Sequence, residues 1–366
     1  MSKKYFYKKS FKTAFSLVEL SIVVLIIGIL IAGISQSSRL VRAMKLTTAR
    51  SLTRSSDVNS IRNLTAWFDA TAEGVMSTAL PLTANATYTS PENRDNVMVW
   101  KDSNPQDAEA DKVVLYNNNT ANSPMYLANG IGGLPSLYFD NADILVSNNL
   151  VTMPLQAGSR NYSMFVVFNY DRTAVDSAAT ACNISGIFSI GNGNGGGAGD
   201  LIKVDTWDSR YIAVDFSNTT NFAQTWFQFN KSIKNETNYA FGFSADLNYN
   251  YTELACPSGS QCNKVNAYLN STSPITRRNT GNSSSPPAAS VGFFGIGGDV
   301  SNTTTSVNLY GTATNIYNGS PANYNSGCGG FKGLISEVIV FDRTLTNEES
   351  SSVMAYLIKK YNLKSV

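Results

Sequence analysis

The chain has 366 residues, 43% of them hydrophobic and 15% charged, which is enough for one large domain or two ordinary ones beside an apolar N-terminal segment. Histidine is absent, which excludes Ser-His-Asp and Cys-His catalysis and the commonest transition-metal ligand. The formal charge is +2, but five lysines precede residue 15 with no acid among them. Without these five, 23 basic residues stand against 26 acidic ones, a net of −3, so no basic patch for nucleic acid is expected.

Residues 15–34, FSLVELSIVVLIIGILIAGI, form an apolar stretch whose one charged residue is Glu19. As a helix, a stretch of this length rises about 30 Å, the thickness of the hydrocarbon core. It is longer than the apolar core of a cleaved secretory signal, which has about 7 to 15 residues. A carboxylate inside a membrane costs about 2.5 to 3.5 kcal/mol and usually has a partner. An ordinary membrane anchor therefore fits the length and leaves Glu19 unexplained.

A known signature supplies that partner. The segment KTAFSLVELSIVVLIIGILIAGI resembles the type IV prepilin signature, with a basic leader (1–14) that includes Lys12, a small residue at Ala14, an aromatic residue at Phe15 and an acid at Glu19. In that family a membrane peptidase cleaves before the residue matching Phe15 and methylates the new amine. The resemblance implies cleavage between Ala14 and Phe15, although the family usually has glycine where Ala14 stands. It also implies that Glu19 faces the N-terminus of a neighbouring subunit during assembly.

The same resemblance implies partners and a location. The partners are other pilin subunits, through the N-terminal helix, and a prepilin peptidase. Before assembly the subunit lies in the inner membrane with a periplasmic or extracellular head, and after assembly it belongs to a cell-surface filament. We expect the helix to continue as a polar, amphipathic half to about residue 55, within an N-terminal segment of 15–58. The alternative is an uncleaved membrane anchor.

From residue 62 to 366 the pattern changes to short runs of aromatic and β-branched residues, such as YSMFVVFNY and LISEVIVFD, separated by Asn, Gly, Ser and Pro. These runs predict one mostly β domain, a sandwich of two packed antiparallel sheets. A final helix is predicted by the capping box of Thr346 and Glu349, after which Val353, Tyr356, Leu357 and Tyr361 lie largely on one face. We expect that face to lie against the sandwich.

The closing segment GLISEVIVFDRTLTNEESSSVMAYLIKKYNL and the opening run LTAWFDA resemble the concanavalin A-like (laminin G-like) domains of bacterial surface proteins. The resemblance implies a jelly-roll sandwich with a lectin-like binding surface for a glycan or a surface protein. Glucanases of that fold carry an E-x-D-x-E cluster, as glycoside hydrolysis needs paired carboxylates. No such cluster occurs, and Glu337 stands alone in its strand. We therefore expect no enzyme activity; a carbohydrate hydrolase is the alternative from the enzyme class.

Calcium is a candidate ligand, since related domains often bind it through aspartates at the sandwich rim, and none of the candidates forms an EF-hand loop. No other cofactor is expected. The calcium candidates are Asp102, Asp140, Asp143, Asp200, Asp205 and Asp208. Aromatic residues that could stack on a sugar are Trp207, Tyr211, Trp226 and Tyr249.

The four cysteines are even in number, and no CxxC pair is present, so disulfides in an exported head are favoured over a zinc site. Cys256 and Cys262 bracket a turn-like segment and are expected to pair, which leaves Cys182 with Cys328; four cysteines permit three pairings.

Taken together, these features predict a minor pilin or pseudopilin that presents a lectin-like head for adhesion or ligand binding. Two alternatives stay open. One is a principal filament subunit, or a secretion-system pseudopilin, whose head binds no ligand. The other is an uncleaved surface lectin held by its membrane helix.

Overall fold

The computed structural model describes residues 16–80, 88–109, 111–147, 161–171, 184–191, 199–205, 211–217, 222–228, 237–246, 262–280, 293–298, 304–309, 312–317 and 330–365. The chain forms two compact units, residues 1–47 and residues 48–366. We call the second the head unit.

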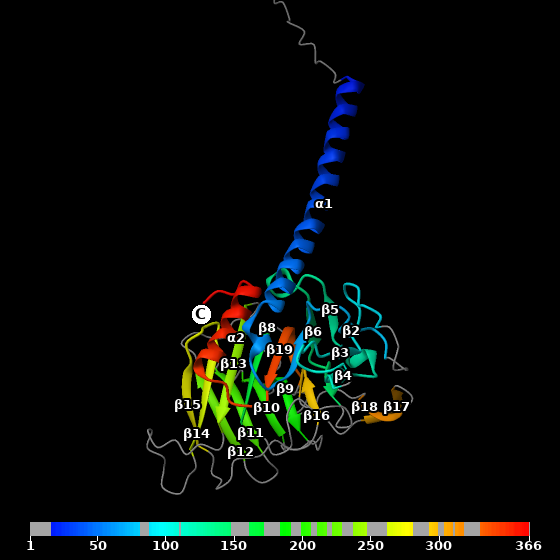
Figure 1. The fold of residues 1–366 in the computed structure, drawn as a ribbon. Coiled ribbons are helices and arrows are strands. Elements are labelled where there is room, and N and C mark those ends of the chain that lie inside the picture. Colours follow the sequence, from blue (N-terminus) through cyan, green and yellow to red (C-terminus); the bar gives the residue numbers. More distant parts are fainter. Residues whose placement is uncertain are drawn as a thin grey trace, which may run out of the picture. The chain divides into compact units, whose positions relative to one another are not determined.

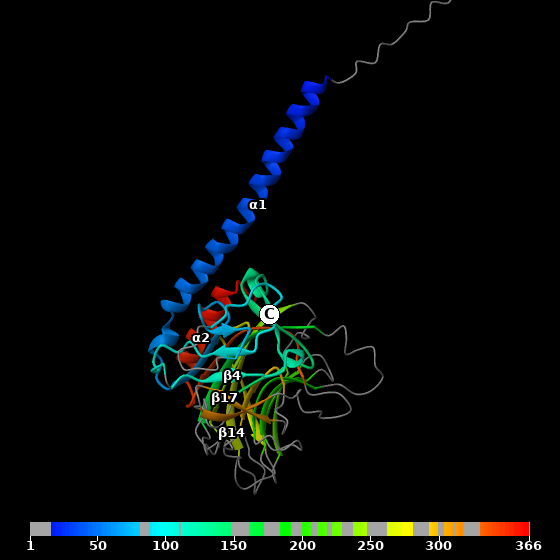
Figure 2. The same cartoon turned by 90° about the vertical axis from the view of Figure 1, so that its right-hand side faces the viewer.

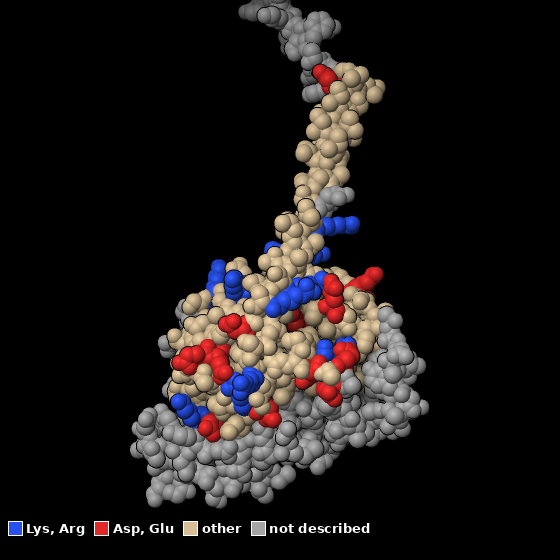
Figure 3. Space-filling view, viewed as in Figure 1, with Lys and Arg blue, Asp and Glu red and all other residues tan. Residues whose placement is uncertain are grey.

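Helix α1 (Leu17–Arg54) begins in the first unit and ends in the head unit. Its apolar side chains are exposed from Leu17 (86%) to Ile34 (70%), and Figure 3 shows a long stretch of the helix without charged side chains. Among the described residues, α1 is the one helix that is both long enough and apolar enough to cross a membrane. Glu19 lies in its first turn, where the carboxylate accepts a hydrogen bond from the Ser16 backbone at 2.9 Å.

The predicted N-terminal segment extends to 58, but α1 ends at Arg54. The side chain of Asn59 explains this end, because its Nδ2 donates to the carbonyl oxygens of Thr53 at 2.9 Å and Arg54 at 3.1 Å. These two hydrogen bonds satisfy carbonyl groups at the end of the helix that have no intrahelical donor. A short 3-10 helix, Asp57–Ser60, then leads to the first strand.

The head unit contains two large antiparallel sheets and a two-stranded ribbon (Figure 1). The first sheet has the order β15 (Ile275–Thr280), β14 (Cys262–Leu269), β13 (Asn238–Asp246), β8 (Asn161–Tyr170), β19 (Lys332–Phe341), β6 (Ser136–Asp140), β5 (Met125–Leu127), and β1 (Leu64–Asp69) also pairs with β19. The second has the order β12 (Phe222–Gln228), β11 (Tyr211–Ser217), β10 (Gly199–Asp205), β9 (Ile184–Gly191), β16 (Phe293–Ile296), β7 (Leu145–Ser147), β4 (Val114–Tyr116), β3 (Val99–Lys101), β2 (Met76–Ser77). The ribbon pairs β17 (Thr304–Leu309) with β18 (Thr312–Tyr317). Two further 3-10 helices span Thr120–Asn122 and Ile131–Gly133.

The main core fills the space between the two sheets. It joins side chains of the first sheet, such as Phe68, Phe168 and Phe241, with side chains of the second, such as Trp100 and Phe294. Burying each of these rings stabilises the fold by about 1.5 to 3 kcal/mol. The predicted mostly β architecture of packed antiparallel sheets is thus confirmed, while the jelly-roll connectivity stays a prediction.

A second apolar cluster covers the other face of the first sheet. Helix α2 (Asn347–Lys360) packs there against β8 and β13 (Figure 1), and Val353 and Leu357 are completely buried. Figure 2 shows α2 from the side. The predicted capping box is confirmed: Thr346 accepts from the backbone of Glu349, and Glu349 accepts from the backbone of Thr346. The first sheet therefore lies between the second sheet and a helical layer, and β8 is apolar on both faces.

Candidate functional site

Two carboxylates lie on the helix-covered face of the first sheet. In β1, Ala66 and Phe68 face the main core, so Trp67 and Asp69 face the helical layer. Glu337 of β19 is the register partner of Asp69. A bulge between Ile335 and Glu337, opposite β8, shifts the alternation of β19 by one residue. The bulge therefore turns Glu337 toward the same layer as Asp69.

Lys360, at the end of α2, joins these two carboxylates. Its Nζ lies 2.7 Å from Asp69 Oδ2 and 2.7 Å from Glu337 Oε2. The Lys360 and Glu337 side chains are 0% exposed and that of Asp69 is 1% exposed. We call these three residues the carboxylate-lysine cluster. A buried ion pair needs further hydrogen bonds to offset the loss of hydration, and the surroundings supply them.

The Glu337 carboxylate accepts three hydrogen bonds from aromatic side chains. Tyr356 donates its hydroxyl to Oε1 at 2.7 Å, Trp67 donates Nε1–H to Oε1 at 2.6 Å, and Tyr361 donates to Oε2 at 2.9 Å. The Lys360 ammonium also lies 5.5 Å and 5.3 Å from the ring centres of Tyr356 and Tyr361. The aromatic rings thus enclose the cluster and orient Glu337.

Asp69 has its own set of donors. Oδ1 accepts from the Thr71 backbone at 2.8 Å and from the Thr71 hydroxyl at 2.7 Å, and Oδ2 accepts from the Thr53 hydroxyl at 3.2 Å. Thr53 belongs to the last turns of α1 and also contacts the Tyr356 hydroxyl at 2.9 Å. The cluster therefore connects three elements of the head unit: the end of α1, β1 with β19, and α2.

Burial decides the electrostatics of the cluster. It raises the pKa of Glu337 above its usual range; Lys360 opposes this rise, and the neighbouring Asp69 adds to it. Burial also raises the pKa of Tyr356 and of Tyr361 well above 10, so both stay neutral hydrogen-bond donors. Two buried acids share one ammonium, and Glu337 therefore takes up a proton more readily than an exposed carboxylate does.

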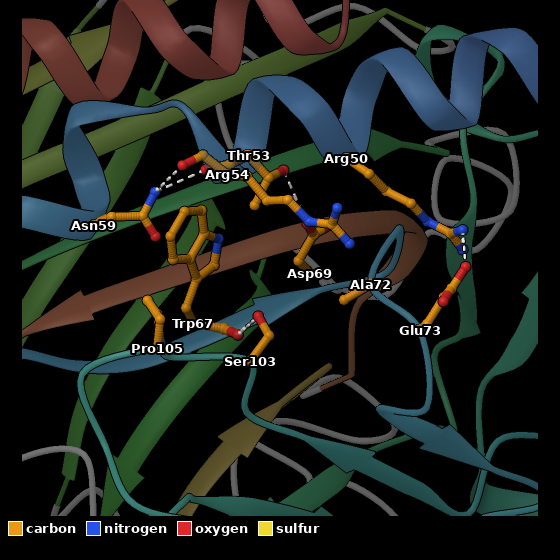
Figure 4. Close-up of a pocket in the computed structure, with 10 residues that line it drawn as sticks. All are labelled: Arg50, Thr53, Arg54, Asn59, Trp67, Asp69, Ala72, Glu73, Ser103 and Pro105. Carbon is orange, nitrogen blue, oxygen red and sulfur yellow. Dashed lines mark hydrogen bonds and ion pairs between the residues drawn. The ribbon is translucent and has the colours of Figure 1, made fainter.

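A pocket of about 190 Å³ opens beside Asp69 of the cluster. Figure 4 shows the residues that line it. Trp67, Ala72 and Pro105 form apolar parts of its lining, and Asp69 also reaches it. The remaining lining residues are Arg50, Thr53, Arg54, Asn59, Glu73 and Ser103.

Arg50 fixes the end of α1 beside this pocket. It forms an ion pair with Glu73 and donates Nε–H to the Thr71 carbonyl at 2.7 Å. A second hollow of about 330 Å³ shares Arg50, Ala72 and Glu73 with the pocket. Each hollow has a mixed apolar and polar lining, as small-ligand sites do.

The structure brings two of the calcium candidates together. Asp143 Oδ2 accepts from the backbone of Asp140 at 2.9 Å, and burial together with the charge of Asp140 raises the pKa of Asp143 to about 7. Asp102 lies elsewhere, where it accepts backbone hydrogen bonds from Trp67 and Asn104. Over the described ranges, no three His, Cys, Asp or Glu side chains are grouped as a metal site. Calcium binding stays a prediction.

Two of the sugar-stacking candidates, Tyr211 and Trp226, lie in neighbouring strands of the second sheet. Asp205 of β10 pairs with Tyr211 of β11, and Trp226 of β12 pairs with Ala213 of β11. Asp200 lies earlier in β10 and Cys262 begins β14. The structure describes the backbone but not the side chains of these five predicted residues, Asp200, Asp205, Tyr211, Trp226 and Cys262. Ala14, Phe15, Cys182, Trp207, Asp208, Tyr249, Cys256 and Cys328 lie outside the described residues altogether.

The sequence reasoning missed the carboxylate-lysine cluster, since it treated Glu337 as isolated. Asp69 is separated from Lys360 by 291 residues, so no local motif joins them. The available signal was indirect: Asp69 and Glu337 each interrupt an apolar strand, and Lys360 falls on the apolar face of the final helix. A charge at a core-facing position usually needs an opposite charge nearby.

Comparisons with known proteins assign no family. Neither a family model nor a curated protein matches the chain. The receptor binding domain of botulinum neurotoxin D aligns over 82% of this chain and 54% of its own length, at 11% identity and a TM-score of 0.45. The carbohydrate-binding module CBM40 of Ruminococcus gnavus IT-sialidase, solved with alpha2,3 sialyllactose, aligns over 54% of this chain and 84% of its own, at 12% identity and a TM-score of 0.33.

The binding domain of Paraclostridial Mosquitocidal Protein 1 aligns over 81% of this chain and 52% of its own, at 9% identity and a TM-score of 0.46. The chain thus spans about half the length of the toxin domains that it matches. At these identities and TM-scores, the similarities assign no ligand to this protein.

Proposed function

We propose that the protein is a type IV pilin-like subunit that presents a lectin-like sandwich head for adhesion at the cell surface. One observation carries the proposal: the N-terminal part of α1 exposes an almost unbroken apolar surface with a single acid, Glu19, in its first turn. Such a surface requires a membrane or apolar partner helices. A pilin-like subunit uses both, first the inner membrane and then the helices of neighbouring subunits.

Glu19 gains a role in this proposal. Cleavage between Ala14 and Phe15 would create a positive amine four residues before Glu19. In a bundle of such helices, the acid of one subunit pairs with the amine of the next. Separating a buried pair costs about 3 to 5 kcal/mol, so the pair would set the register of assembly.

Contacts inside the head unit hold the last turns of α1 to the sandwich. Arg50 and Thr53, in the last turns of α1, bond to Thr71 and Asp69 of the sandwich. Ala49 in the same turns is 2% exposed. The end of α1 is therefore part of the head unit, as a head displayed at the end of a pilin-like helix requires.

The proposed head binds rather than catalyses. The pocket beside the cluster and the adjoining hollow have mixed polar and apolar linings, which suit a small polar ligand such as part of a glycan. A glycan array probed with the full-length protein in detergent tests this part. Retention on defined glycans, reduced by Arg54→Ala at the pocket, supports it; no retention on any glycan contradicts it.

Substitution of Glu19 tests the assembly part. Glu19→Ala should leave membrane insertion intact, because it makes the segment more apolar, and should lower the amount of protein recovered in sheared filaments several-fold. Ser21→Ala, at another exposed site of the same helix, is the matched control and should be recovered like the parent. Equal recovery of Glu19→Ala and parent would contradict the pairing.

A further inference from the structure

The carboxylate-lysine cluster has the parts needed to form a covalent bond. An amine, Lys360 Nζ, lies 2.7 Å from the carboxyl oxygen Oδ2 of Asp69, and a second carboxyl, Glu337, lies 2.7 Å from the same amine. We propose that Lys360 and Asp69 become joined by an intramolecular amide (isopeptide) bond, with Glu337 as the group that moves the proton. The proposal does not depend on the pilin assignment.

The reaction requires a neutral amine and a protonated carboxyl group in contact. An amine attacks only when it carries a lone pair, and a carboxyl accepts attack far better when it is protonated. All three side chains are at most 1% exposed, so the amine and the two carboxyl groups meet away from bulk solvent. Burial raises the pKa of Glu337, which makes its carboxylate a better acceptor for a proton from Nζ.

The hydrogen bonds suit each step of the reaction. The Nζ lone pair attacks Cγ of Asp69, an N–C bond forms, and the carbonyl electron pair moves to Oδ1. The backbone and hydroxyl of Thr71 donate to Oδ1 at 2.8 Å and 2.7 Å, so the developing negative charge meets two fixed donors. Thr71 therefore occupies the place of an oxyanion-stabilising residue.

Glu337 completes the proton balance. The Lys360 ammonium first gives one proton directly to Oδ2 of Asp69, 2.7 Å away, which leaves a neutral amine and a carboxylic acid. As the N–C bond forms, the Glu337 carboxylate takes a second proton from Nζ at Oε2 and passes it to Oδ2 of Asp69, its partner in the β1–β19 register. The Cγ–Oδ2 bond then breaks and Oδ2 leaves as water. An ammonium and a carboxylate thereby become an amide and one water, with no oxidant, reductant or second substrate.

The surroundings also remove the water and protect the product. Asp69 reaches the 190 Å³ pocket, which gives the released water an exit. The side chains of Trp67, Tyr356 and Tyr361, which hold Glu337 by hydrogen bonds, keep bulk solvent from the amide. Amide formation from an acid and an amine is favoured where bulk water is kept away from the reacting groups, as the burial of these side chains does here.

The bond would close the head unit covalently. Asp69 lies in its first strand and Lys360 at the end of its last helix, 291 residues apart. A cross-link across so long a loop restricts the unfolded chain strongly. It would also keep the strand that follows α1 attached to α2 if the head were pulled.

Peptide mapping of the full-length protein decides the matter. The chain is purified in detergent, denatured, reduced and digested with trypsin. The bond predicts a branched peptide that joins residues 63–94 to residues 360–364, lighter than the two together by one water molecule, because trypsin does not cut after an acylated lysine. Separate linear peptides, with cleavage after Lys360, would overturn the proposal.

Three variants assign the roles. Lys360→Arg should abolish the branched peptide, and Lys359→Arg, at the exposed neighbouring lysine, should retain it. Glu337→Gln leaves the Asp69 carboxylate to pair with Lys360, so this variant should fold with the same circular dichroism spectrum as the parent. Because Gln cannot accept the proton from Nζ, the variant should give only linear peptides. A branched peptide from Glu337→Gln would refute the role of Glu337. The peptide map of the parent protein alone decides whether the bond exists. The proposal can therefore be tested even if a variant fails to fold.

Discussion

Asp102→Asn should change how the stability of the head unit depends on pH. Asp102 follows β3 and is fully buried. Its Oδ1 accepts from the backbones of Trp67 at 2.6 Å and Asn104 at 2.7 Å, whereas its Oδ2 has no hydrogen-bond partner within the described structure. Burial, with a smaller contribution from Asp107, raises the pKa of Asp102 from 3.8 to about 7; the two backbone hydrogen bonds and Lys112 oppose the rise.

The sign of the effect follows from which state binds the proton. Between pH 3.8 and about 7 the folded protein holds a proton on Asp102 that the unfolded chain has lost. The stabilisation by this group is therefore complete below pH 3.8 and disappears as the pH rises through about 7. At about 1.4 kcal/mol for each pKa unit, the free energy of unfolding should fall by about 2.5 kcal/mol between pH 5 and pH 8 through this residue alone.

Asn cannot titrate, yet its Oδ1 can accept the same two backbone hydrogen bonds. Relative to the parent, Asp102→Asn should therefore gain about 2.5 kcal/mol on going from pH 5 to pH 8. Urea denaturation in a non-ionic detergent, followed by tryptophan fluorescence at several pH values, measures this difference. Asp57→Asn removes an exposed carboxylate and controls for the change in net charge. Parallel pH profiles for Asp102→Asn and the parent would refute the reasoning.

Two further substitutions test local features of the head unit. Thr346→Ala removes the capping box of α2 and should lower the free energy of unfolding by about 1 kcal/mol; an unchanged urea midpoint would contradict the role of the cap. Gly132→Ala should cost more than Gly74→Ala, although both glycines have positive φ (65° and 69°). A Cβ at Gly132 would lie 2.6 Å from the Tyr361 carbonyl oxygen, and a Cβ at Gly74 meets nothing within 4 Å. Equal losses of unfolding free energy in urea denaturation would show that the backbone at Tyr361 shifts to make room for the Cβ.

Elements with local signals could be predicted from the sequence. The apolar run of α1 and the capping box of α2 each lie within a few residues, and both appear in the structure. Strands were predictable as a class because alternation in runs such as β1 separates core-facing Ala66 and Phe68 from Trp67. The helix was expected to end near residue 55 and ends at Arg54. The sequence did not indicate that the side chain of Asn59 folds back onto the last carbonyls.

The candidate site shows why long-range chemistry escapes sequence reasoning. Glu337 reaches the helix-covered face only because a bulge shifts β19, and no residue pattern announces that bulge. Asp69 and Lys360 meet only after the whole sandwich has formed between them. The strand pattern alone therefore did not indicate a partner for Glu337. Its position in an apolar strand did indicate that the carboxylate needs an opposite charge or hydrogen-bond donors nearby.

The most direct test of the pilin-like proposal is the N-terminal sequence of the mature protein. Peptide mass spectrometry on protein recovered from its native envelope determines where the chain begins. The proposal predicts a mature chain that starts at N-methylated Phe15, with the leader of residues 1–14 absent. A chain that still carries Met1 to Ala14 would contradict it and would favour a sandwich protein held in the membrane by an uncleaved helix.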